Sequence, residues 1–136
     1  PEMIREAYKE ALAAAEAHGI TILIESEPTT NSACCADIAE LVRCVDRPYF
    51  KALYDPGNNI YATDEIPFPD GYLAIADILG HIHIKDARKE NGQVIATAVG
   101  EGAVDYKGIF KTLKKIGYEG DIEENGNPFE EKSMAV

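Results

Sequence analysis

The sequence is poor in basic residues and contains no long apolar run. Only 13 Lys and Arg residues stand against 24 Asp and Glu residues, so the 136-residue chain has a formal net charge of −11. This negative charge opposes binding to phosphates, and we expect no nucleic-acid partner. No segment is long and apolar enough to span a bilayer, and no signal-peptide pattern opens the chain. We therefore expect a cytoplasmic protein with no membrane partner.

Cysteine is also scarce, with Cys34, Cys35 and Cys44 as the three members. An odd number leaves no complete disulfide framework, and the absence of a CxxC pair removes the usual zinc motif. We interpret these residues as small, apolar side chains on a helix in a reducing compartment.

A regular alternation of helical and strand patterns runs along the whole chain. Apolar spacing predicts helices at residues 2–18, 33–45, 70–78 and 106–116. Short β-branched or apolar runs predict strands at residues 20–25, 49–55, 81–85 and 121–124. The stretches 56–69 and 86–104 are otherwise expected to be loops. This alternating order is typical of a parallel α/β architecture.

The residue types at the helix ends agree with this interpretation. Asn31 or Ser32 can cap the second helix, and Asp105 can cap the last one. Gly19 and Gly117 follow the first and last helices, where glycine commonly ends a helix.

One face of the third predicted strand is polar. Ile82 and Ile84 share one side of the strand, while His81, His83 and Lys85 share the other. An open, doubly wound sheet needs two apolar faces. A polar face fits a closed barrel better, because the C-terminal rim of such a barrel holds the active site. Four βα units make half of a barrel, so the chain is a fragment, a half that pairs with another half, or a different sheet.

Each predicted strand ends in a side chain that can bind a metal ion. These side chains are Glu25, Asp55, His83 and a glutamate at position 123 or 124. A glutamate that ends a strand is usually solvated, and DPGN alone is a common turn. Four ligand-type side chains at the same rim would rarely arise by independent coincidence, so together they indicate a metal site. Hard oxygen donors with one imidazole suit Mn²⁺, Mg²⁺, Co²⁺ or Zn²⁺.

Four segments together resemble the second half of the sugar phosphate isomerase/epimerase family, the xylose isomerase-like TIM barrels. They are ILIESEP, ALYDPGNN, GHIHIKDA and GEGAVDYKGIFKTLKKIGYEGDIEEN. The resemblance covers about residues 5–125. It implies an α/β fold that is the C-terminal half of a TIM (β/α)8 barrel, with four parallel βα units. Residues 1–125 would form this half-barrel and residues 126–136 a polar C-terminal tail.

The resemblance also implies a divalent-metal-dependent isomerase or epimerase that acts on a ketose or a related polyol. In the family one divalent ion is held by the residues that correspond to Glu25, Asp55, His83 and Glu124. For this ion we favour Mn²⁺ over Mg²⁺, Co²⁺ or Zn²⁺. Glu25 and Glu124 would also be the catalytic acid–base pair. One carboxylate would remove the proton alpha to the carbonyl, and the other would return it after an enediolate has formed.

The resemblance also implies substrate-contacting residues, and one of them departs from the family pattern. Asn58 stands where many members have a substrate-contacting histidine, and Asn can still donate and accept hydrogen bonds. Lys85 and Asp86 are expected to orient His83 or to contact substrate. Arg88, or Lys89 beside it, is expected to bind a substrate hydroxyl or phosphate. His81 is expected to be a packed, hydrogen-bonded residue.

The last predicted ligand is the second departure. Glu124 lies four residues after Gly120, where the family usually has five. Strict alternation would turn Glu123 inward, and Glu124 would need a bulge to reach the site. We assign the role to Glu124 and keep Glu123 as the alternative.

Two other interpretations stay open. An endonuclease-IV-like nuclease of the same superfamily would need several more histidines than the three present. An isolated half-barrel would expose two sheet edges, which suits an inactive fragment or a homo-oligomer that closes the barrel. Because the sequence starts at Pro1 rather than Met, we expect a processed or excerpted piece of something longer, and a missing N-terminal half-barrel is one possible partner.

Overall fold

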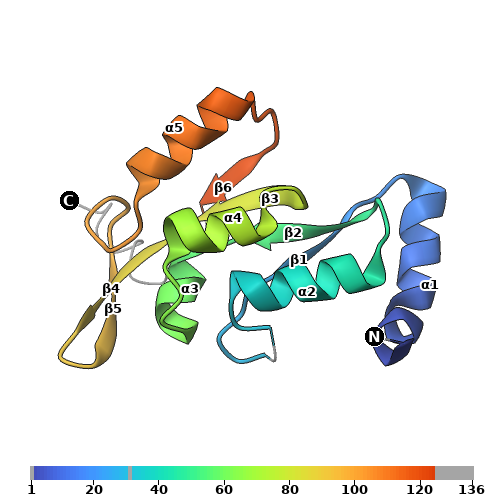
Figure 1. Ribbon diagram of the computed structural model, residues 1–136, viewed down its shortest axis with the longest axis horizontal. Coiled ribbons are helices and arrows are strands. Elements are labelled where there is room, and N and C mark those ends of the chain that lie inside the picture. The colour runs from blue at the N-terminus through green and yellow to red at the C-terminus, as the bar shows by residue number, and fades with distance from the viewer. Residues whose placement is uncertain (1, 31, 125–136) are drawn as a thin grey trace, which may run out of the picture.

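The chain has a mixed α/β fold, which the computed structural model describes for residues 2–30 and 32–124 (Figure 1). The main sheet is parallel, with strand order β1-β2-β3-β6. Its strands are β1 (Ile22–Glu25), β2 (Phe50–Tyr54), β3 (Leu79–Ile84) and β6 (Ile122–Glu124). The predicted parallel sheet of βα units is therefore confirmed, and all four predicted strands are present.

The remaining elements are helices and one hairpin. The antiparallel hairpin is formed by β4 (Asp86–Glu90) and β5 (Gln93–Thr97). The helical elements are α1 (Glu2–His18), α2 (Cys35–Val45), α3 (Pro56–Ala62), η1 (Pro67–Gly71), α4 (Tyr72–Ile75) and α5 (Tyr106–Ile116). None of the described helices has the length and apolarity needed to cross a membrane.

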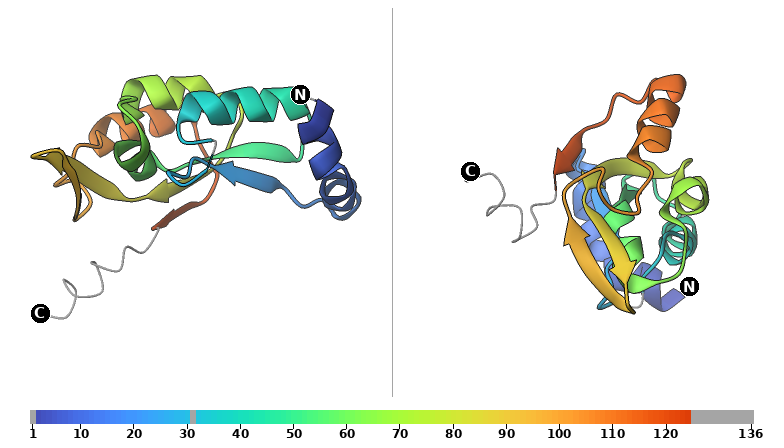
Figure 2. Two further views of the ribbon diagram at one scale, coloured as in Figure 1. Left: turned by 90° about the horizontal axis from the view of Figure 1, so that it is seen from below. Right: turned by 90° about the vertical axis from the view of Figure 1, so that its left-hand side faces the viewer.

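Helices α2 to α5 lie on one side of the main sheet, and its other face is turned away from them (Figure 2). The helices bury the face of the sheet that they cover: on strand β2, Phe50, Ala52 and Tyr54 are all fully buried. They pack in one apolar core with Ile38 of α2 and Ile75 of α4. The side chains between them along β2 point to the opposite face, and the candidate site lies on that face.

Two regions predicted to be loops contain regular structure. Asp55 caps α3 by accepting a hydrogen bond from the backbone N–H of Asn58 at 3.0 Å, and Pro56 occupies the first turn. Both features are typical helix-start signals. The hairpin turns at Asn91 and Gly92, whose φ angles are 51° and 78°. Asn-Gly is a strong signal for such a turn, because both positions need positive φ.

The helix caps confirm one prediction and correct another. Asp105 caps α5 by accepting from the N–H of Gly108 at 2.9 Å, as predicted. Helix α2, however, is capped at Cys34 rather than at Ser32, and Asn31 lies outside the described residues. One carboxylate accepts from the N–H groups of the two residues before this helix, and another accepts from its first two N–H groups. They belong to Asp37 and Glu65.

The cysteines are free thiols at or within α2, as the sequence predicted. Cys35 is only 2% exposed. Burial raises the pKa of its thiol, so this cysteine is a packed side chain and a poor nucleophile.

Candidate metal centre

Three of the predicted ligands meet at the C-terminal ends of three neighbouring strands. Glu25 ends β1, Asp55 directly follows β2, and His83 lies near the end of β3. His83 Nδ1 is 3.2 Å from Glu25 Oε1 and 3.8 Å from Asp55 Oδ2. One ligand atom from each residue lies within 4.8 Å of the other two. The parallel order of the strands produces this meeting, because parallel strands end at the same edge of the sheet.

Asn58 connects the two acidic ligands, Glu25 and Asp55, to each other. Its side-chain N–H₂ donates to Glu25 Oε1 at 3.0 Å and to the carbonyl oxygen of Ser26 at 2.9 Å. Its backbone N–H donates to the Asp55 carboxylate, so one residue of α3 orients both acidic ligands. Lys85 Nζ donates to the side-chain oxygen of Asn58 at 2.7 Å. The sequence predicted Asn58 and Lys85 as substrate contacts, and the structure places both beside the three ligands.

The carboxylates of Glu25 and Asp55 lie close together where little solvent reaches them. Asp55 is fully buried, and the Glu25 side chain is 28% exposed. Burial raises the pKa of Glu25, and the nearby charge of Asp55 raises it further, while His83 acts in the opposite direction. Two close carboxylates with an imidazole form a donor set that a divalent cation would satisfy. The residues present therefore fit the metal ion that the family implies.

Gly57 allows α3 to approach β3 closely. A Cβ atom at this position would lie 2.5 Å from the carbonyl oxygen of Lys85 and 2.7 Å from its Cγ. Because one contact is to backbone, the clash cannot be relieved by a side-chain rotation alone. The glycine thus permits the Lys85–Asn58 hydrogen bond.

We expect Gly57→Ala to lower the free energy of unfolding by about 1–3 kcal/mol, the usual cost of overpacking. Urea unfolding followed by circular dichroism measures this quantity. An unchanged free energy of unfolding would contradict the close approach of α3 to β3.

Two further predicted residues lie elsewhere. Arg88 is in β4, where its guanidinium pairs with Glu90, and no described contact joins it to the three ligands. Asp86 is fully buried and accepts hydrogen bonds from backbone N–H groups rather than orienting His83. Its donors are Ala87, Gly100, Gly102 and Val104. The expected role of Asp86 at the site is therefore wrong, because its carboxylate is used to hold the loop after β5.

The β3–β6 pairing bears on the last ligand. Glu123 lies opposite His83, and Glu124 lies opposite Ile84, without a bulge between these strands. Strict alternation then gives Glu123, not Glu124, the face that carries the histidines. The side chain of Glu124 lies outside what the structure describes.

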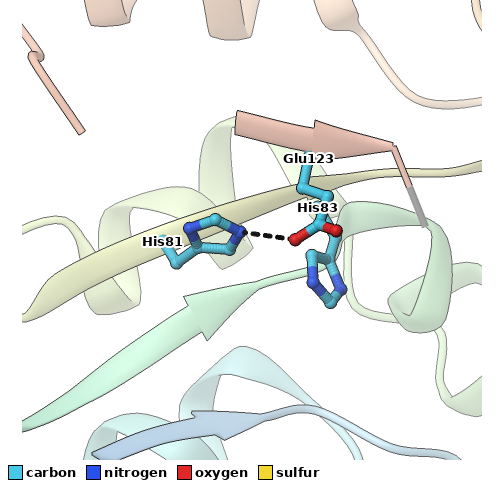
Figure 3. Close-up of side chains that lie close together, drawn as sticks. All are labelled: His81, His83 and Glu123. Atoms are coloured by element: carbon cyan, nitrogen blue, oxygen red, sulfur yellow. Dashed lines mark ion pairs between the residues drawn. The ribbon is translucent and has the colours of Figure 1, made fainter. Parts of the chain in front are cut away.

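His81 lies in a second group that the sequence did not predict. His81, His83 and Glu123 place one ligand atom each within 4.8 Å of the other two (Figure 3). The His-x-His pattern was a usable signal, since it puts both rings on one side of a strand. The contribution of Glu123 depends on the strand register, which the sequence does not give.

The chain belongs to the xylose isomerase-like TIM barrel family, whose model matches residues 2–123. A relative from Escherichia coli (strain K12) is named "Putative L-ribulose-5-phosphate 3-epimerase SgbU". It is 37% identical over an alignment of 79 residues, and the match covers 55% of this chain and 27% of the relative.

Solved structures show the same fold. A xylose isomerase domain protein from Planctomyces limnophilus is similar with a TM-score of 0.78 and 24% identity, over 95% of this chain and 46% of that one. A xylose isomerase-like TIM barrel protein from Mycobacterium smegmatis, in complex with magnesium, gives a TM-score of 0.75 and 21% identity, over 91% and 44%. The chain thus spans less than half the length of these two proteins and a smaller share of the curated relative.

Proposed function

We propose that this chain carries the metal centre of a divalent-metal-dependent sugar isomerase or epimerase. The observation that supports it is the meeting of Glu25, Asp55 and His83 at the ends of three adjacent parallel strands. The family and the epimerase name of the E. coli relative agree with a sugar substrate. Because the chain spans only part of these relatives, the activity of the whole protein is part of the proposal.

The ion would be held by Glu25, Asp55 and His83, with a glutamate of β6 as a further ligand. Glu124 was our assignment from the sequence, and the β3–β6 register supports Glu123. Mn²⁺ is our first choice, and Mg²⁺, Co²⁺ and Zn²⁺ accept the same donor types. When bound, the ion would act as a Lewis acid that polarises the carbonyl of a ketose.

Glu25 is the proposed base. Its carboxylate is 28% exposed and lies beside the other two ligands, where it could accept a proton from a sugar bound at the centre. The C–H bond alpha to the carbonyl breaks, the proton moves to Glu25, and the electron pair passes to the carbonyl oxygen as an enediolate forms. The β6 glutamate then returns a proton to the opposite face of the same carbon, which inverts that centre. Its return to the neighbouring carbon, with transfer of the hydroxyl proton of the first carbon to the former carbonyl oxygen, gives the isomer.

Asn58 and Lys85 are the proposed substrate contacts nearest to this chemistry. The Lys85 ammonium lies 5.2 Å from the Tyr61 ring centroid and donates to Asn58, so it is held near the ligands. An ammonium in this place can donate to a sugar hydroxyl or a phosphate. Arg88 stays a prediction, since it would need to leave Glu90 to contact the same substrate.

Calorimetric titration with Mn²⁺ tests the metal centre. We expect one ion per chain and a loss of affinity of at least about 10- to 100-fold in Glu25→Gln, because even outer-shell changes cost this much. Glu40→Gln is the matched control, since Glu40 is exposed on α2. Equal Mn²⁺ affinity in both variants would refute the centre.

Proton exchange tests the chemistry separately. With Mn²⁺ and L-ribulose 5-phosphate in D₂O, we expect deuterium to enter at C3, the carbon next to the carbonyl, and Glu25→Gln to abolish the exchange. Nuclear magnetic resonance measures it directly. Mn²⁺ binding without exchange would restrict the proposal to the metal centre, with the chemistry dependent on the rest of a longer protein.

A further inference from the structure

A second group of possible ligands lies beside the proposed metal centre. His81 and His83 alternate along β3, so both rings are on the same side of the strand, and their centroids are 5.4 Å apart. Glu123 of β6 lies opposite His83 in the parallel pairing. In Figure 3 its carboxylate lies next to the His83 ring, and the dashed line joins one of its oxygens to His81. Two strands therefore present two imidazoles and one carboxylate to the same point.

The spacing suits a shared ion better than direct contact. His81 Nε2 is 3.7 Å from Glu123 Oε2, which is beyond an ordinary N–H···O hydrogen bond. Ligand atoms about 2.1 Å from a tetrahedral ion would be separated by about 3.4 Å. The His81–Glu123 separation is therefore close to the value that two ligands of one ion would have, and all three ligand atoms lie within 4.8 Å of one another.

Burial supports the same interpretation. The His81 and His83 side chains are only 16% and 17% exposed, whereas that of Glu123 is 73% exposed. The rings are held by the sheet, and the carboxylate is free to adjust. Three protein ligands also leave one position of a tetrahedral ion for water or another oxygen ligand.

We propose that His81, His83 and Glu123 form a second cation site, which prefers a nitrogen-binding ion such as Zn²⁺. Imidazole ligands suit Zn²⁺, whereas the carboxylates of Glu25 and Asp55 suit Mn²⁺ or Mg²⁺. His83 belongs to both groups, and Glu123 is also the β6 glutamate proposed as a further ligand of the first centre, whereas His81 belongs only to the second group and Glu25 only to the first. The second site does not depend on the proposed isomerase or epimerase activity.

Paired titrations with Zn²⁺ and Mn²⁺ separate the two sites. We use His81→Phe, which keeps an aromatic ring without ligand nitrogens, and Glu25→Gln, with His18→Ala as the histidine control. We expect His81→Phe to weaken Zn²⁺ binding by at least about 10- to 100-fold and to leave Mn²⁺ binding unchanged. Glu25→Gln should weaken Mn²⁺ binding and leave Zn²⁺ binding unchanged, and His18→Ala should change neither affinity.

Zn²⁺ affinity that survives in His81→Phe and falls in Glu25→Gln would overturn the proposal, because Zn²⁺ would then occupy the first group. An equal loss of both ions in a folded His81→Phe would also overturn it. Glu123→Gln provides a second variant if His81→Phe fails to fold, since this exposed carboxylate is not needed for packing. Retained Zn²⁺ affinity in Glu123→Gln would count against the site. Mn²⁺ binding to the unaltered chain reports on the proposed function independently of all these outcomes.

Discussion

His83→Ala should remove high-affinity binding of both Mn²⁺ and Zn²⁺, a larger loss than we expect from any other single substitution at the site. His83 is the histidine that the two ligand groups share. Its loss leaves Glu25 and Asp55 without their imidazole and leaves His81 with Glu123 alone. Because outer-shell changes already cost about 10- to 100-fold in affinity, we expect at least about 100-fold for each ion.

Calorimetric titration with each ion measures this effect, and far-ultraviolet circular dichroism checks that the variant is folded. His18→Ala is the matched control, since His18 is exposed at the end of α1. Mn²⁺ affinity equal to that of the control would mean that the carboxylates bind without His83. That result would refute the proposed three-residue centre.

The strands and the placement of the ligands on them could be predicted from the sequence. Short apolar runs that each end in Glu25, Asp55 or His83 follow directly from composition and alternation. A parallel sheet then brings strand ends together, which is why the three ligands meet. The prediction needed no knowledge of side-chain conformations.

What the sequence could not give depends on contacts between distant segments. Asp86 is next to Lys85 in the chain, and sequence proximity suggested a shared role at the site. In the structure its carboxylate accepts hydrogen bonds from the neighbouring N–H of Ala87 and from three backbone N–H groups in the loop after β5, which need an acceptor. The role of Glu123 likewise depends on the β3–β6 register.

The missed hairpin has a different cause. The signal at Asn91 and Gly92 was present, but the expectation of a simple βα repeat favoured a loop between the third strand and the last helix. Local turn chemistry was the better guide in this segment. The hairpin matters for the site, because Asp86 begins β4 and fixes the chain directly after Lys85.

Asp86→Ala should lower the free energy of unfolding by about 3–5 kcal/mol, because it removes a buried, charged acceptor from several donors at once. Asp86 is fully buried, and its oxygens lie 2.9 Å from the nitrogens of Ala87 and Gly100, with Gly102 and Val104 at 3.0 and 3.2 Å. A domain of this size has about 5–15 kcal/mol in total, so the variant should be close to unfolding.

Urea unfolding of Asp86→Ala, Asp86→Asn and Asp70→Ala tests this account. Asn keeps one acceptor oxygen but places an N–H₂ group against N–H donors, so its loss of stability should lie between those of the other two variants. Asp70 is exposed, and its replacement should leave the free energy of unfolding unchanged. If Asp86→Ala unfolds like the Asp70 control, the four hydrogen bonds do not stabilise the loop. A destabilised Asp86→Asn that still binds Mn²⁺ with full affinity would show that Asp86 supports the fold and not the metal centre.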